Sequence, residues 1–119
     1  MRNEVRHIRL SRDCLGRSIE VETMAFHEGV HISVYGGDLG HIGAVSIVEP
    51  GGQVETIQFP GHRDAVVSEA WARALAELGA APIVVEAGIH FDGLQRDEIR
   101  EVLDKTDELL ERMRDALRE

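Results

Sequence analysis

The feature that most constrains this fold is a change in the spacing of apolar residues halfway along the chain. From residue 4 to residue 59 apolar and polar residues alternate, whereas from Val66 onward apolar residues recur every three or four positions. Alternation is typical of strands with one buried face, and the longer period is typical of amphipathic helices. The first half should therefore build a sheet, and the second half should supply helices that cover it.

Five strands are expected in the first half, over residues 4–10, 17–26, 30–36, 42–49 and 53–59. The short segment His27-Glu28-Gly29 predicts a hairpin between the second and third strands. The strongest turn signal, Pro50-Gly51-Gly52, predicts a second hairpin between the fourth and fifth.

Helical spacing then runs over residues 66–78 and 99–117, with a buried strand at 82–89 between the two helices. Runs of strands followed by helices indicate an α+β fold. We expect one domain over residues 1–119, with a largely antiparallel sheet of about six strands and two helices packed on it. Helices on one face would leave the other sheet face for a partner subunit.

Composition excludes several function classes. The chain has 22 acidic and 13 basic residues, a net charge of −9, which argues against binding to nucleic acid or to an anionic membrane surface. Cys14 is the single cysteine, so neither a disulfide framework nor a cysteine zinc site is expected. It falls in a polar segment, "SRDCLGRS", which we interpret as a turn between strands. The N-terminal residues lack the apolar core of a signal peptide, which favours a cytoplasmic protein.

Three glycine-rich segments, each with one histidine, are the candidate functional regions. They are "YGGDLGHIGAV" (35–45), "FPGHRD" (59–64) and "EAGIHFDG" (86–93). All three lie at junctions between predicted elements, where functional residues concentrate. Glycines in the first segment permit either a loop that holds a ligand or an irregular connection between strands.

The second segment precedes a helix and places His62 and Arg63 beside its first amides, a pattern typical of anion sites. Asp64 is a favourable N-cap whose charge would compete with an anion, so a plainly capped helix is the alternative. In the third segment, Asp92 and Gln95 have the spacing of a capping box.

His41, His62 and His90 together also permit a zinc site with three imidazole ligands. No short HxH or HxxxH pair forces these residues to converge, so this remains an alternative.

The motifs "VHISVYGGDLGHIGAV", "FPGHRDAVVSE" and "EAGIHFDGLQRDEI" resemble the prenylated flavin chaperone family, the small D-type subunits of hydroxyarylic-acid and gallate decarboxylase systems. The likeness covers residues 30–99. The family's "FPGHK" is "FPGHR" in this chain, so Arg63 preserves the cation. The resemblance implies a fold similar to that of eukaryotic proteasome-assembly chaperones, usually dimeric.

It also implies a function. Such proteins accompany a large UbiD-like decarboxylase whose prenylated flavin mononucleotide (FMN) is made by a UbiX-like prenyltransferase. This chain is accordingly expected to be a homodimer that binds, delivers or helps to mature that cofactor and is not itself the decarboxylase. The residues that the motifs implicate in cofactor binding are Tyr35, Gly36, Gly37, Asp38, His41, Gly43, Gly61, His62, Arg63 and His90.

Two alternatives remain open at this stage. One is an assembly chaperone that docks on the decarboxylase through its sheet without binding a small ligand. The other is a metal-dependent enzyme built on His41, His62 and His90.

Overall fold

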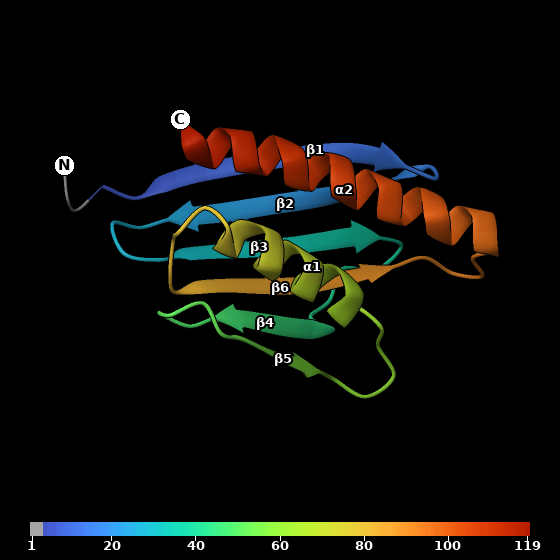
Figure 1. Cartoon of the computed structure of the whole chain (residues 1–119). Helices are drawn as coiled ribbons and strands as arrows, with labels where there is room; N and C mark the ends of the chain where they lie inside the picture. The colour runs from blue at the N-terminus through green and yellow to red at the C-terminus, as the bar shows by residue number, and fades with distance from the viewer. Residues whose placement is uncertain (1–3) are drawn as a thin grey trace.

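A computed structural model describes residues 4–119 and has a six-stranded sheet with two helices (Figure 1). The elements are β1 (Arg6–Cys14), β2 (Arg17–Ala25), β3 (Val30–Gly37), β4 (Ala44–Val48), β5 (Val54–Gln58), α1 (Ala65–Ala76), β6 (Ile83–His90) and α2 (Arg96–Arg118). The predicted order of five strands, helix, strand and helix is confirmed, and the fold is α+β.

The strands lie in the order β1-β2-β3-β6-β4-β5. Both predicted hairpins form, β2–β3 and β4–β5, and every neighbouring pair is antiparallel except β3 with β6. Strand β6 enters between β3 and β4 because α1 carries the chain back across the sheet before β6 begins. The sheet is therefore mixed but mostly antiparallel.

The prediction of a polar turn around Cys14 is wrong. Strand β1 continues to Cys14, which pairs with Arg17, and the turn is only Leu15 and Gly16, both with positive φ. Cys14 is consequently 2% exposed, and burial raises the pKa of its thiol. A buried thiol with a raised pKa is a poor nucleophile.

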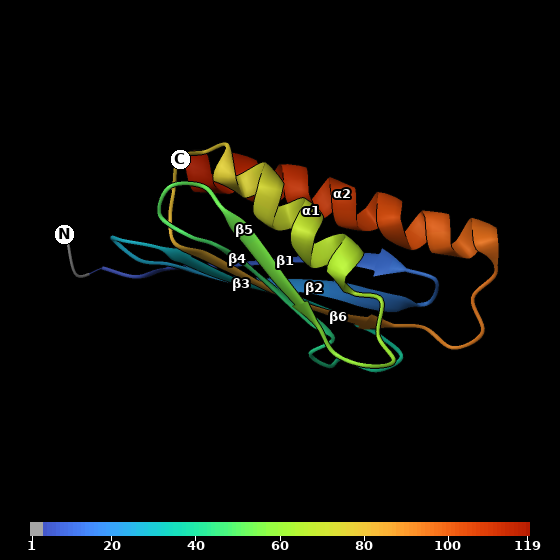
Figure 2. The same ribbon diagram turned by 60° about the horizontal axis from the view of Figure 1, so that its bottom comes forward.

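Both helices pack on the same face of the sheet (Figure 2). Alternate strand residues such as Ile19, Ile32 and Val85 meet Trp71 of α1 and Leu109 of α2 in the core. No helix of the described residues is long and apolar enough to cross a membrane. Within residues 4–119, no helix or strand covers the opposite face of the sheet, as the sequence predicted.

Helix α2 begins at a capping box formed by Gln95 and Glu98, not by Asp92 and Gln95 as the spacing predicted. The Gln95 N–H donates to Glu98 Oε1 at 3.0 Å. Because α2 starts only after its N-cap, Gln95, residues 91–95 form a loop that lies beside the start of α1. The N-termini of both helices and the carboxyl end of β6 thus lie at one end of the molecule.

Candidate cofactor-binding site

The three glycine–histidine segments converge at that end. The rings of His41 and His62 stack with centroids 4.5 Å apart, and His90 meets His41 edge-on at 6.4 Å. His41 comes from the β3–β4 loop, His62 from the β5–α1 loop and His90 from the last position of β6. Residues separated by up to 49 positions therefore form one cluster because β6 inserts beside β3 and β4.

Glycines permit this convergence by allowing close packing. A Cβ at Gly88 would overlap the carbonyl of His41, and one at Gly43 would overlap the carboxylate of Asp64. The β3–β4 loop can therefore lie directly on β6. Close packing inside the protein accounts for both glycines without a ligand.

Asp64 is the buried anchor of the cluster, and the sequence reasoning missed this role. It is 7% exposed, accepts the Ile89 N–H at 3.0 Å through Oδ1, and lies 2.9 Å from His41 Nε2 through Oδ2. Although Asp64 occupies the N-cap position of α1, its side chain makes no capping hydrogen bond. The only sign of this role in the sequence was the presence of an acidic residue at position 64. Its orientation toward β6 depends on tertiary packing, which the local sequence does not specify.

A cavity of about 480 Å³ opens beside these residues. It is lined by His41, Gly61, His62, Arg63, Asp64, Val66, Val67, Ile89, His90, Phe91, Leu94, Ile99, Val102 and Leu103. Imidazoles and a guanidinium supply the polar part of the lining, and apolar side chains from α1, α2 and the loop before α2 supply the rest, which we call the apolar wall. Small-molecule sites commonly combine an apolar wall with a few convergent polar groups.

Five of the residues expected from the motifs line this cavity: His41, Gly61, His62, Arg63 and His90. The apolar wall was not expected from the motifs. Its signal was present in the apolar residues at the start of each helical pattern, such as Val66 and Ile99, which remain exposed.

The other expected residues lie elsewhere. Gly36 packs against the backbone of Ser18, and Gly37 packs against the carbonyl of His90. Tyr35 lies on the uncovered sheet face, where its hydroxyl donates to Glu22 and this hydrogen bond raises the pKa of Tyr35. It lines a separate hollow of about 280 Å³ on that face.

Asp38 has a structural role in this arrangement. Its carboxylate accepts from Arg17 Nε at 2.8 Å and from the Asp92 N–H at 2.8 Å. The hydrogen bond from Arg17, followed by that from the Asp92 amide, lowers the pKa of Asp38. Asp38 thereby ties the β3–β4 loop to β2 and to the loop that precedes α2.

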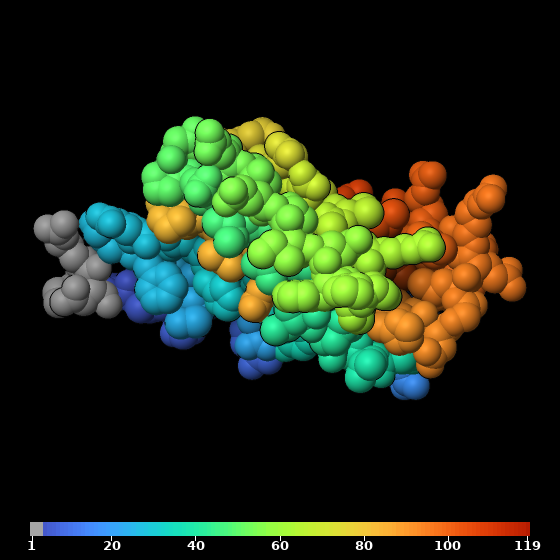
Figure 3. Space-filling view, turned by 90° about the horizontal axis from the view of Figure 1, so that it is seen from below, coloured from blue at the N-terminus to red at the C-terminus, as the bar shows by residue number. Residues whose placement is uncertain are grey.

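The first amides of α1 already have partners within the protein. The Ala65 N–H donates to Gln58 Oε1 at 3.1 Å, and the Val67 N–H donates to the Asp64 carbonyl at 3.0 Å. An anion in the cavity would therefore depend on the side chains of His62 and Arg63 more than on these amides. Figure 3 views the molecule from the β5 edge and shows the segment from β5 into α1 at the surface.

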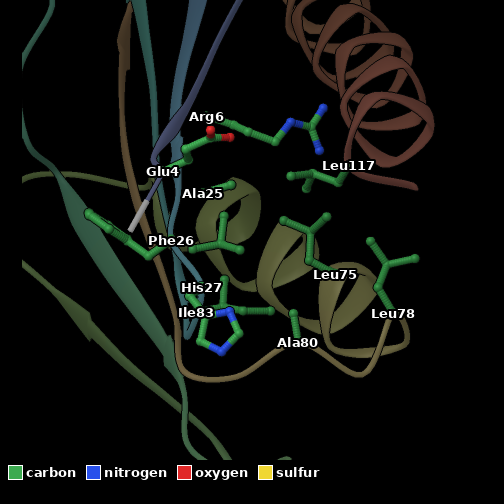
Figure 4. Close-up of a pocket in the computed structure, with 11 residues that line it drawn as sticks. Glu4, Arg6, Ala25, Phe26, His27, Leu75, Leu78, Ala80, Ile83 and Leu117 are labelled. Atoms are coloured by element: carbon green, nitrogen blue, oxygen red, sulfur yellow. The ribbon is translucent and has the colours of Figure 1, made fainter. Parts of the chain in front are cut away.

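A second hollow of about 340 Å³ lies at the opposite end, between β2, β6 and the final turns of both helices (Figure 4). Its walls include Ala25, Leu75, Leu78 and Leu117. Arg6 lies at its rim and donates to the carbonyl oxygen of Ala116 at 2.9 Å, near the end of α2. None of the residues expected from the motifs lines this hollow.

Comparison with known proteins agrees with the resemblance. Protein LpdD from Lactiplantibacillus plantarum is 31% identical over 83 residues, which cover 66% of this chain and 61% of LpdD. The crystal structure of a chaperone complex for yeast 20S proteasome assembly superposes with a TM-score of 0.64 at 12% identity, covering 96% of this chain and 95% of that one. This second likeness shows the fold alone. A family model for the prenylated flavin chaperone LpdD-like domain matches residues 13–118, and the chain therefore belongs to that family.

Proposed function

We propose that this protein is a non-catalytic accessory chaperone that holds prenylated FMN in the cavity at the N-termini of α1 and α2 and transfers it to a UbiD-like decarboxylase. The observation that carries the proposal is the convergence of all three family motifs on one cavity that is lined by both polar and apolar side chains. This combination matches a ligand that has a phosphate at one end and a prenyl-modified ring at the other.

The phosphate is assigned to His62 and Arg63. Arg63 is exposed, lines the cavity and has no ion-pair partner among residues 4–119, so its guanidinium is available to a ligand. Guanidinium groups bind phosphate through paired, charge-assisted hydrogen bonds. The half-buried imidazole of His62 lies next to it and can donate a further hydrogen bond.

The ring is assigned to the apolar wall. Phe91 and Leu94 come from the loop before α2, while Val66 and Ile99 come from the first turns of the two helices. Val66 is 63% exposed and Ile99 is 47% exposed, so the wall is accessible from solvent. An accessible wall suits a cofactor that is held and then released.

The uncovered sheet face is assigned to a second copy of this chain. Val45, Ile47, Ile57 and Val84 lie on neighbouring strands of that face, in register across β5, β4 and β6. On the same face, Glu86 pairs directly with Val45, and the cation of Arg9 and the carboxylate of Glu22 lie farther across the sheet, on β1 and β2. A two-fold interface must be self-complementary, and a face that carries charges of both signs and an apolar region meets that condition.

Titration calorimetry under anaerobic conditions, with reduced and oxidised prenylated FMN in separate runs, tests the cofactor assignment. The wild type should bind one form saturably, and Arg63→Ala should weaken binding by about tenfold or more because a charge-assisted hydrogen bond is lost. His62→Ala should weaken it as well. Arg118→Ala, which removes an exposed cation at the C-terminal end of α2, is the matched control and should leave binding unchanged.

The same proteins distinguish the assembly-chaperone alternative, which the apolar sheet face favours. If neither flavin form binds and the decarboxylase still captures wild type and Arg63→Ala equally, the cofactor assignment fails and ligand-free docking is supported. If substitutions on the sheet face then abolish capture of this protein by the decarboxylase, that face is the docking surface.

A further inference from the structure

We propose that His41, His62 and Asp64 form a binding site for one divalent transition-metal ion. One potential ligand atom from each residue lies within 4.8 Å of the other two. The proposal does not depend on flavin binding, and it differs from a site of three histidines because the third ligand is a carboxylate.

The hydrogen bonds of His41 provide the second observation. Its Nδ1 lies 3.2 Å from the carbonyl oxygen of Leu39, and its Nε2 lies 2.9 Å from Asp64 Oδ2. Both neighbours are acceptors, whereas a neutral imidazole has only one N–H to donate. In the tautomer in which Nδ1 donates to Leu39, Nε2 is an acceptor that faces a second acceptor, Asp64 Oδ2, and a metal ion between the two would satisfy both.

The position between His41 and Asp64 is largely buried. The side chain of Asp64 is 8% exposed and that of His41 is 17% exposed, and His41 is the ion-pair partner of Asp64 within residues 4–119. A buried carboxylate requires pairing or metal coordination. The Leu39 carbonyl also fixes Nε2 as the free ligand atom of His41, which is the outer-shell arrangement common to metal-binding histidines.

The donor set indicates the class of ion. Two imidazoles with one carboxylate favour Zn²⁺, Fe²⁺, Co²⁺ or Mn²⁺ over Ca²⁺ and Mg²⁺, which prefer oxygen ligands. Bond lengths of about 2.0–2.1 Å place tetrahedral ligands roughly 3.3 Å apart. His41 and Asp64 would separate only slightly, while the half-buried His62 would rotate toward them.

Three protein ligands leave a coordination position open. All three residues line the same cavity as Arg63, so a ligand in that cavity could reach the open position. An anionic ligand could therefore contact the ion and the guanidinium together.

The test uses the untagged full chain after treatment with a chelator, titrated with Co²⁺ and followed by its visible absorption, and then with Zn²⁺ by calorimetry. We expect one ion per chain and a cobalt spectrum typical of coordination by nitrogen and oxygen. His62→Ala and Asp64→Asn should each weaken Zn²⁺ binding by at least about tenfold, because loss of even an outer-shell partner has effects of that size.

His90→Ala is the matched control, since His90 lies in the same cluster but its Nε2 faces Asp92 Oδ1 at 2.8 Å. It should bind Zn²⁺ as the wild type does. Absence of saturable binding, binding unchanged in His62→Ala, or binding lost in His90→Ala would each overturn the proposal. If Asp64→Asn fails to fold, as thermal melting would show, the comparison of His62→Ala with His90→Ala still decides.

Discussion

Single glycines set the geometry of the cavity. Sequence alone left two interpretations of the motif glycines, a ligand cradle or a structural connection. At Gly43 and Gly88 the missing Cβ makes room for Asp64 and for the carbonyl of His41. These glycines therefore shape the cavity indirectly, by letting the polar side chains approach β6.

Replacing Gly88 with alanine should lower the free energy of unfolding by about 1–3 kcal/mol, because the new Cβ displaces the backbone of His41. Gly40→Ala is the control, in the β3–β4 loop that packs on Gly88, since its Cβ would meet Tyr35 at an ordinary contact distance of 3.4 Å. Its change should stay within about 0.5 kcal/mol. Urea denaturation of both variants measures the difference, and equal stabilities would contradict this packing.

At the level of single residues, the sequence predicted the clustered histidines but not the residue that His41 contacts, Asp64. The motifs identified His41, His62 and His90 as candidates, and these do converge. Asp64 was recognised only as a capping residue, since its contact with the Ile89 amide joins positions 25 apart. Nothing in the local pattern specifies such a contact.

At the scale of elements, alternation and helical periodicity predicted the strands, helices and both hairpins. They did not predict that β3 and β6 pair in parallel, because the register of distant strands is set by packing and not by local pattern. The true extent of β1 was also missed, since the two-residue turn at Leu15 and Gly16 allows pairing to continue to Cys14.

Acid should weaken the attachment of α2 to β1. Arg12 Nε donates to Glu108 at 2.7 Å, and this hydrogen bond lowers the pKa of Glu108. Glu108 therefore binds a proton more readily in the unfolded chain than in the folded protein. The stability that the pair contributes is present above the ordinary carboxyl pKa of about 4 and is lost as the pH falls through the lowered pKa of folded Glu108. Asp38, whose pKa is lowered by Arg17, should act in the same direction.

Thermal melts between neutral pH and about pH 3 measure this effect, since that range spans the ordinary carboxyl values. Glu108→Gln should lose less stability on acidification than the wild type, and Arg12→Gln should resemble it because the same pair is removed. Parallel curves for all three proteins would show that the pair contributes nothing to acid sensitivity.

At the scale of the whole molecule, both helices of residues 4–119 lie on one side of the sheet, and within that range no element covers the other face, as layering predicted (Figure 2). We expect the wild type to form a dimer through that face and therefore to sediment as a dimer. Ile57 is 58% exposed, so Ile57→Asp should dissociate the dimer without disturbing the fold of each copy. Val66→Asp places the same charge at an exposed apolar residue on α1 and should leave the dimer intact.

A wild type that sediments as a monomer would contradict the proposed dimer. A dimer that dissociates in Val66→Asp but persists in Ile57→Asp would contradict the proposed interface. Sedimentation velocity at several concentrations provides the measurement. Neither outcome bears on the cavity, because the two faces lie on opposite sides of the sheet.

The central claim is that the three motifs build one cofactor cavity, and a crystal structure of the protein with prenylated FMN tests it most directly. The account predicts phosphate density in contact with His62 and Arg63, and the ring against Phe91 and Leu94. Cofactor density beside Tyr35 on the open sheet face, or in the hollow near Leu75 and Leu117, would contradict it.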